Sequence, residues 1–291
     1  MLHDDNPRNR RIGIALVTLT TLLFATLDTC AKWLVLSLPV LQVVWLRFLT
    51  HVLITSVLLA PTYGRELVRV RNWKLQMLRA GMLATMTACN FGALRYLQLA
   101  ETSAMQFSVP LLIALLSAWW LGERLDARRW LAIAVGFGGV LLVIRPGSHA
   151  FHPAILLMVV QALLYAGFNI LTRRLAATES AASLQLMSAV GATVMLAPFG
   201  LAQWQWPANW QSWLLIAACG LCGGFGHFFV AQAHRYASAA VLGPFLYQQI
   251  IYMTLGGWLV FGQVPDGMVV AGAGVVVASG LYLLWLEMKR R

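Results

Sequence analysis

Apolar runs of about 20 residues follow one another along nearly the whole chain, with only short breaks between them. A helix of about 20 residues is long enough to cross the hydrocarbon core of a bilayer. Only 11% of the 291 residues are charged and 60% are hydrophobic, whereas about a quarter of the residues of a soluble domain are charged. We therefore expect an all-α membrane protein with ten transmembrane helices, at residues 12–34, 39–61, 75–95, 103–121, 128–145, 153–173, 181–203, 212–233, 241–261 and 267–287.

The basic residues are distributed unevenly between the two sets of predicted loops. Those on the side of the N-terminus are Arg8, Arg10, Arg11, Arg65, Arg69, Arg71, Lys74, Arg124, Arg128, Arg129, Arg173, Arg174, Arg235, Lys289, Arg290 and Arg291. The opposite side has Lys32, Arg95 and Arg145. Because cytoplasmic loops of membrane proteins are rich in Lys and Arg, we expect both termini in the cytoplasm. The formal charge of +11 thus reflects topology, and we expect no nucleic-acid partner.

The two halves of the chain are similar to each other. "LLFATLDTCAKWL" (Leu22–Leu34) has the outline of "LLYAGFNILTRRL" (Leu163–Leu175), 141 positions later. Arg95–Asp126 aligns without gaps with Arg235–Asp266, at an offset of 140. Each half has five predicted helices, an odd number, so the second half must be inverted in the membrane relative to the first. Inverted repeats around a site near the bilayer midplane are typical of secondary transporters.

Further residues make the chain resemble a known family. "WWLGERL" (Trp119–Leu125) closes the fourth predicted helix, the glycine-rich "GFGGVLLVIRPG" follows it, and "VVWLRFLTHVL" places an arginine early in the second helix. These features resemble the paired EamA repeats of the drug/metabolite transporter superfamily, and most of all its bacterial aromatic and neutral amino-acid exporters. The second copy, "VFGQVP" (Val260–Pro265), lacks the acid and the base of the motif. The resemblance implies a ten-helix exporter or exchanger with a central cavity lined by the first four helices of each half.

The repeats divide the chain into four segments. We expect a cytoplasmic tail at residues 1–11, one EamA-like repeat at 12–147, a second at 153–287, and a basic cytoplasmic tail at 288–291. The membrane is expected to be a bacterial inner membrane, which the chain crosses several times. The glycine-rich fifth and tenth helices could pack within the bundle or between two copies, so the sequence leaves a monomer and a homodimer open.

Two charged residues, Asp28 and Arg47, fall at similar depths in adjacent predicted helices. Charges inside a membrane are costly unless they are paired, so we predict an ion pair between them. Asp28 could instead pair with Lys32, one turn away. The pair either locks the two helices together or serves transport, by holding the charged end of a substrate or by carrying a coupling proton.

Polar and aromatic residues in the other predicted helices are candidates for a substrate cavity, because lipid cannot satisfy polar groups. They are Trp45, Asn90, Phe91, Tyr96, Gln106, Phe107, Tyr165, Asn169, His227, Phe228, Gln232, Tyr247, Gln248 and Tyr252. Ordinary packing between helices explains the same residue types. Gln248 and Gln249 are adjacent and point about 100° apart on a helix, so they cannot both face one cavity. His227 could carry a coupling proton or only bridge two helices.

We predict a secondary transporter that exports small zwitterionic metabolites, aromatic and other neutral amino acids above all, by alternating access through this cavity. Another small metabolite or a drug-like compound is the alternative substrate. A channel and an intramembrane enzyme are more distant alternatives. The chain has no GxxxxGK, HExxH or GxSxG motif, so we expect no direct use of ATP, no enzymatic activity, no metal and no cofactor. The expected partners are a small-molecule substrate and the lipid bilayer.

Overall fold

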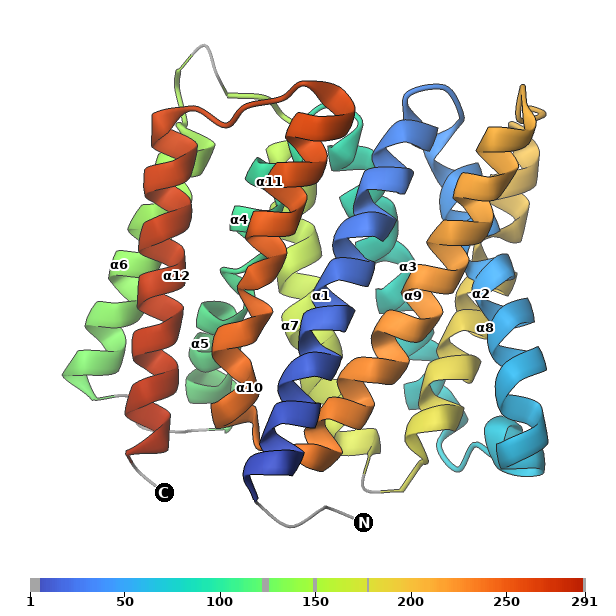
Figure 1. Cartoon of the computed structure of the whole chain (residues 1–291), viewed down its shortest axis with the longest axis horizontal. Coiled ribbons are helices and arrows are strands. Elements are labelled where there is room, and N and C mark those ends of the chain that lie inside the picture. The colour runs from blue at the N-terminus through green and yellow to red at the C-terminus, as the bar shows by residue number, and fades with distance from the viewer. Residues whose placement is uncertain (1–5, 122–125, 149–150, 177, 290–291) are drawn as a thin grey trace.

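Long helices stand side by side in the computed structural model, which describes residues 6–121, 126–148, 151–176 and 178–289 (Figure 1). The described residues contain no β-strand, as the all-α expectation requires. In chain order the elements are α1 (Pro7–Val35), α2 (Val40–Tyr63), the 3-10 helix η1 (Gly64–Val68), α3 (Trp73–Leu94), α4 (Leu99–Gln106), α5 (Val109–Leu121), α6 (Ala127–Ile144), α7 (Ile155–Leu175), α8 (Ala181–Ala202), α9 (Trp210–Tyr236), α10 (Ala239–Leu246), α11 (Gln248–Phe261) and α12 (Gly267–Met288).

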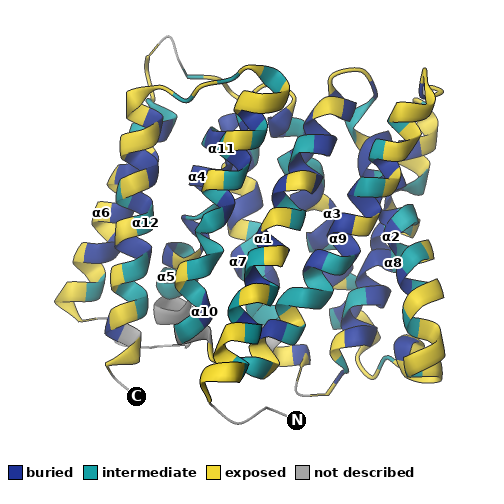
Figure 2. Ribbon diagram, viewed as in Figure 1, coloured by how far each residue is buried: buried dark blue, intermediate teal, exposed yellow. Residues whose placement is uncertain are grey.

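The outer surface of the bundle is apolar. Figure 2 shows exposed residues along the outward faces of the helices and buried residues toward the middle. Large hydrophobic side chains on the outward faces include Leu141 of α6, Val194 of α8, Leu214 of α9 and Leu259 of α11, each more than half exposed. Exposure of such an apolar surface is unfavourable in water and favourable in contact with lipid. Eight helical segments of the described chain are long and apolar enough to cross a membrane.

Two of the ten predicted spans are not among those eight segments. They are α3 and the pair α10 and α11. α3 contains the buried polar residues Gln76, Arg79 and Thr87, which lower its hydropathy. α10 and α11 are each too short to span a membrane, with 8 and 14 residues. The count of ten spans therefore stays a prediction.

The first helix begins earlier than predicted. It starts at Pro7, and the Asn6 side chain accepts a hydrogen bond from the Asn9 amide at 2.8 Å. Asn before the first turn and Pro within it are favourable helix starts. Residues 7–11 therefore belong to α1, although the apolar pattern placed them in a tail.

The predicted fourth and ninth helices are each broken within their first half. The fourth is divided into α4 and α5 around Phe107 and Ser108, and the ninth into α10 and α11 at Tyr247. Pro110 lacks the amide that would bond the carbonyl of Gln106, which accounts for the first break. Hydropathy alone predicted two continuous helices, because the residues at the breaks are not strongly polar.

Figure 1 shows that α1 begins at the end of the bundle with both termini, whereas α7, the first helix of the second half, begins at the opposite end. We call these the terminal end and the distal end. The halves pack around each other through corresponding helices: α2 on α8, and α6 on α12. Phe107 and Tyr247, 140 positions apart, stack with ring centroids 4.9 Å apart. Corresponding residues that touch each other must lie close to the axis that relates the two halves.

Buried Lys32 joins α1 to the end of α3. Its ammonium donates to the carbonyl oxygens of Leu94, at 2.9 Å, and Leu97, at 2.5 Å. A cation is favourable there because the last carbonyls of a helix carry partial negative charge. Lys32 lies in the last turn of α1, on the side opposite the N-terminus as predicted, but it bonds these carbonyl oxygens and does not pair with Asp28.

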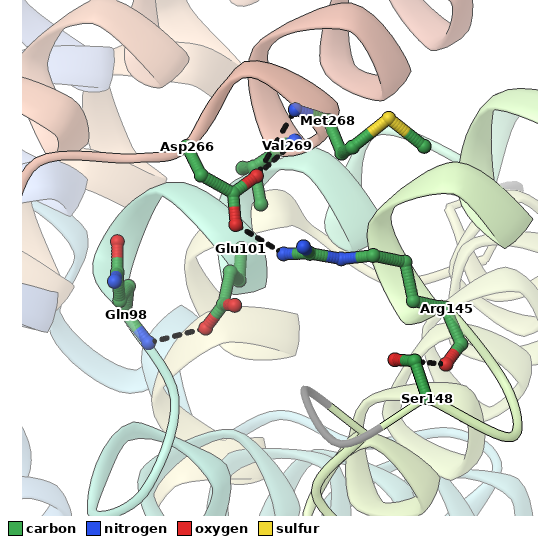
Figure 3. A network of polar contacts seen from close by, with 7 residues as sticks. All are labelled: Gln98, Glu101, Arg145, Ser148, Asp266, Met268 and Val269. Atoms are coloured by element: carbon green, nitrogen blue, oxygen red, sulfur yellow. Dashed lines mark hydrogen bonds and ion pairs between the residues drawn. The ribbon is translucent and has the colours of Figure 1, made fainter.

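At the distal end an ion pair joins the two halves of the chain (Figure 3). Arg145, at the end of α6, pairs with Asp266, at the start of α12. The Asp266 carboxylate also accepts from the amides of Met268 and Val269, each at 3.0 Å. Hydrogen bonds from Val269 and from Arg145 hold the pKa of the Asp266 carboxyl below its ordinary value. The pair fixes the distal ends of α6 and α12 to each other.

α6 and α12 approach closely at two glycines. A Cβ at Gly139 would lie 2.9 Å from the carbonyl oxygen of Gly272, and a Cβ at Gly272 would lie 2.6 Å from the carbonyl oxygen of Gly139. Such contacts require glycine on both helices. Gly138, the neighbour of Gly139, has nothing within 4 Å of the position of a Cβ.

We expect Gly139→Ala to destabilise the protein and Gly138→Ala to leave it as stable or more stable. The first variant overpacks the interface, at a cost of about 1–3 kcal/mol. The second gains helix propensity, worth up to ~1 kcal/mol. Thermal unfolding of the purified protein in detergent measures the difference. Equal shifts of the two midpoints would show that the α6–α12 contact is not close-packed.

Candidate substrate cavity

A polar cavity lies in the middle of the bundle, between the two halves of the chain. Its volume is about 90 Å³. It is lined by residues from α1, α2, α3, α4, α7, α9 and α11, namely Phe24, Leu27, Asp28, Arg47, Leu83, Met86, Thr87, Asn90, Phe91, Gln106, Gln161, Tyr165, His227 and Gln249. Both halves of the chain contribute, as expected for a site on the axis of an inverted repeat.

The cavity holds one carboxylate. Asp28 of α1 is 4% exposed, and it accepts a hydrogen bond from the Asn90 amide of α3 at 3.0 Å. Neither Arg47 nor Lys32 pairs with it, since Lys32 bonds carbonyl oxygens of the chain segment after α3 and the ion pair found in the described chain is Arg145–Asp266. The described residues thus show no direct Asp28–Arg47 ion pair, although both charges line the same cavity as predicted. Asp28 reaches Asn90 because α1 and α3 pack side by side.

Arg47 supplies the positive charge of the cavity. It is 4% exposed, and its Nε and Nη1 groups have no hydrogen-bond partner among the described residues. Its guanidinium lies over the ring of Phe48, 4.2 Å from the centroid. A buried donor that lacks a partner costs free energy, so such groups indicate a place where a ligand or water binds.

Unpartnered acceptors lie in the same cavity. The Oδ1 atom of Asn90 and the Oε1 atom of Gln161 are buried and accept no hydrogen bond from the described residues. The Asp28 carboxylate lines the same cavity as these acceptors and as the donors of Arg47. The cavity thus contains unpartnered donors and acceptors together with charges of both signs.

Aromatic rings complete the wall. Phe24 of α1 meets the ring of His227 edge-on, with centroids 5.0 Å apart. Tyr165 of α7 lies against Phe168, and Phe91 of α3 is fully buried. These rings offer an apolar surface beside the charged groups.

The structure brings part of the predicted site together in this cavity: Asp28, Arg47, Asn90, Phe91, Gln106, Tyr165 and His227. Of the two adjacent glutamines, Gln249 lines the cavity, whereas Gln248 accepts a hydrogen bond from the Tyr252 hydroxyl at 3.1 Å.

The other predicted residues lie elsewhere. Tyr96 is 60% exposed and stacks on His152, and Trp45 packs on Trp204. The Asn169 amide donates to the Tyr165 carbonyl at 2.7 Å, and Gln232 accepts from Arg235 at 3.1 Å. Phe228 lines a separate apolar pocket beside α2. Phe107 and Tyr247 stack on each other, and Tyr252 bonds Gln248. The sequence selected these residues for polar or aromatic character, which does not specify the direction in which a side chain points, and they are not among the residues that line the cavity.

Several lining residues were not predicted: Phe24, Leu27, Leu83, Met86, Thr87, Gln161 and Gln249. A signal for Phe24 was present, since it corresponds to Tyr165 in the internal repeat, 141 positions later. Gln161 lies one turn before Tyr165 on the same helix face, so helical periodicity would have found it. The apolar residues carried no signal.

The LGE motif begins at Leu121, and its remaining residues fall within 122–125, which lie outside the described part of the chain. Within the described residues, no group of three or more His, Cys, Asp and Glu side chains could hold a metal ion.

A second buried arginine shows what a structural arginine in this bundle looks like. Arg79 of α3 donates to the Thr172 hydroxyl at 2.8 Å, to the Leu184 carbonyl at 2.7 Å, and to the Ser188 hydroxyl. It thereby joins α3 to α7 and α8. Arg47 makes no such set of bonds through Nε and Nη1.

We expect the two arginines to differ in their contribution to stability. Arg79→Met leaves buried acceptors without their donor, which costs about 1–3 kcal/mol. Arg47→Met removes a buried charge with unpartnered donors, so it should cost less, or stabilise the protein. Unfolding midpoints of both variants in detergent measure this difference. A larger loss for Arg47→Met would mean that Arg47 is a structural residue.

The structure has the features of a membrane transporter: an apolar exterior, two halves arranged about an axis, and a central cavity with charges of both signs. The sequence pattern of the EamA-like transporter family matches residues 11–145 and 152–285. The chain belongs to this family, and it contains two copies of the repeat.

Relatives of known name are similar over nearly the whole chain. The S-adenosylmethionine uptake transporter of Rickettsia prowazekii is 25% identical, over 95% of this chain and 94% of that protein. The riboflavin transporter of Vibrio cholerae is 26% identical, over 92% and 91%. The pseudopaline exporter of Pseudomonas aeruginosa is 26% identical, over 93% and 95%. A solved crystal structure shares the fold, with a TM-score of 0.64 and 20% identity, over 99% of this chain and 100% of that one.

Proposed function

We propose that this protein is a secondary transporter that exports small zwitterionic metabolites, aromatic and other neutral amino acids above all. The observation that carries the proposal is the presence of unpartnered donors and acceptors in one cavity. Arg47 offers unpartnered donors, while Asp28, Asn90 and Gln161 offer acceptors. An amino acid carries a carboxylate and an ammonium group and would satisfy both kinds of group.

Each group has a role in this proposal. Arg47 binds the carboxylate, because a guanidinium matches the geometry of a carboxylate with two parallel hydrogen bonds. Asp28, held by Asn90, binds the ammonium group together with Gln161. Phe24, Phe91 and Tyr165 pack against the side chain of the substrate. Arg47 and Asp28 have no bulk water to bond inside the bundle, and the charged groups of the substrate take the place of that water.

The names of two relatives support this substrate class and direction. S-adenosylmethionine contains the amino and carboxylate groups of methionine, so one relative is named for a substrate with both groups. The pseudopaline exporter is named for export. The S-adenosylmethionine transporter is named for uptake, so the names of the relatives include both directions, and export is the direction we propose.

Transport proceeds by alternating access across ten spans in this proposal. Pockets for drug-sized ligands usually measure roughly 300–1,000 Å³, so a cavity of about 90 Å³ must widen before it holds a whole amino acid. The bundle must open at one end and then at the other to bind and release the substrate. We place the terminal end in the cytoplasm of a bacterium, because the basic loops lie on that side.

Counterflow in proteoliposomes tests the substrate class. Vesicles are preloaded with unlabelled phenylalanine, and entry of labelled phenylalanine is followed without any ion gradient. We expect saturable exchange that is inhibited by neutral amino acids. Phenethylamine, which lacks the carboxylate, and phenylpropionate, which lacks the amino group, should inhibit far less. Equal inhibition by all three compounds would exclude recognition of a zwitterion.

Two cavity variants test which charged group of the substrate each residue binds. Arg47→Gln should weaken binding of phenylalanine more than binding of phenethylamine, and Asp28→Asn should weaken binding of phenylalanine more than binding of phenylpropionate. Loss of one charged hydrogen bond costs about 1.5–3 kcal/mol, which is at least a tenfold change in affinity. Arg128→Gln, at an exposed position of α6, is the matched control. If Asp28→Asn keeps full exchange but loses accumulation driven by a proton gradient, Asp28 carries a proton and does not bind the ammonium group.

A further inference from the structure

Two apolar clusters flank the cavity, one toward each end of the bundle. The terminal cluster consists of Ile14, Val17, Ala233, Ala237, Leu242 and Phe245, from α1 and from the region of α9 and α10. The distal cluster includes Ala93, Leu97, Met105, Ala154, Ile155 and Met158, from the region of α3 and α4 and from α7, and it extends to Val143 of α6 and Ala273 of α12. Within each cluster most of these side chains are fully or almost fully buried.

The clusters correspond to each other through the internal repeat. Ile14 and Val17 correspond to Ile155 and Met158, 141 positions later. At the offset of 140, the pairs are Ala93 with Ala233, Leu97 with Ala237, and Met105 with Phe245. The same structural position is thus apolar and buried at both ends, once in each half of the chain.

At least one helix of each cluster also lines the cavity. α1 gives Phe24 and Asp28 to the cavity and Val17 to the terminal cluster. α7 gives Tyr165 to the cavity and Met158 to the distal cluster. Along α1 and along α7, the cluster residues therefore lie between the cavity residues and the start of the helix. Separating the helices of a cluster would open the cavity toward that end.

Small residues set how closely each cluster packs. A Cβ at Gly13 of α1 would lie 2.9 Å from the Cβ of Ala237 and 3.2 Å from a methyl group of Leu242. The residue that corresponds to Gly13 is Ala154, 141 positions later, which is 6% exposed within the distal cluster. Neither position has room for a larger side chain while its cluster is closed.

We propose that the two clusters are the gates of the transporter, and that Gly13 and Ala154 are the positions that let each gate close. A larger side chain at Gly13 holds the terminal gate open, and a larger side chain at Ala154 holds the distal gate open. The inference rests on the proposed transport function, to which it adds the residues that decide which end of the cavity is open.

Labelling of a cysteine in the cavity tests the gates without any substrate. Cys30, Cys89, Cys219 and Cys222 are replaced by Ala, and Thr87→Cys is introduced at the cavity wall. A small membrane-impermeant thiol reagent is added to right-side-out and to inverted membrane vesicles. A tag on the N-terminus identifies the terminal side.

Gly13→Leu should raise the rate of labelling from the terminal side and lower it from the distal side, whereas Ala154→Leu should do the opposite. Overpacking of a close contact shifts an equilibrium by about tenfold or more. Gly138→Leu, where a Cβ meets nothing within 4 Å, is the matched control and should change neither rate. If Gly13→Leu does not accumulate, Ala237→Leu overfills the same gate from the other wall.

Unchanged labelling in both variants, or labelling that rises from the same side in both, would overturn the proposal. Opposite changes in the two variants support the gates even if the protein exchanges no amino acid. In that case the gates would stand, and only the proposed substrate class would be wrong. Normal amino-acid exchange with symmetric labelling would keep the proposed substrate and reject these gates.

Discussion

A charged side chain inside a membrane must find its partners within the protein, because lipid offers none. The apolar exterior of this bundle makes that constraint strict, and each buried charge meets it in a particular way. Lys32 uses the carbonyl oxygens of Leu94 and Leu97, so it holds α1 against the end of α3. Arg79 uses a carbonyl and two hydroxyl groups of α7 and α8. These two cations join helices, and their donors are occupied by the protein itself.

Arg47 and Asp28 meet the constraint only in part. Arg47 keeps two donor groups without partners, and the Asn90 amide that bonds Asp28 has an unpartnered oxygen. The bundle tolerates these groups where its helices enclose a cavity, and there they become available to a substrate. The same physical rule that makes Lys32 and Arg79 structural residues thus marks Arg47 and Asp28 as candidates for function.

Glycines allow this polar interior to close. A Cβ at Gly223 of α9 would lie 2.8 Å from Nη2 of Arg47, and a Cβ at Gly220 would lie 2.0 Å from the Thr50 hydroxyl. α9 therefore approaches the polar face of α2 only because it has no side chains there. These two glycines have a specific role: they make room for Arg47 and Thr50 on the facing helix.

The sequence by itself determined the membrane environment, the helical fold and the internal repeat, since these depend on composition, on the length of apolar runs and on the order of residues in two windows. It also identified Asp28, Arg47, Asn90 and Tyr165 as polar residues that must avoid lipid.

Only the tertiary structure decided which partner each of them has. Lys32 bonds α3 and not Asp28, Asp28 bonds Asn90 and not Arg47, and Gln249 faces the cavity where Gln248 does not. The breaks at Phe107 and Tyr247 also appeared only in the structure. The physical reason is that hydropathy gives the depth of a residue along a helix, whereas its partner depends on the rotation of that helix and on the neighbours it packs against.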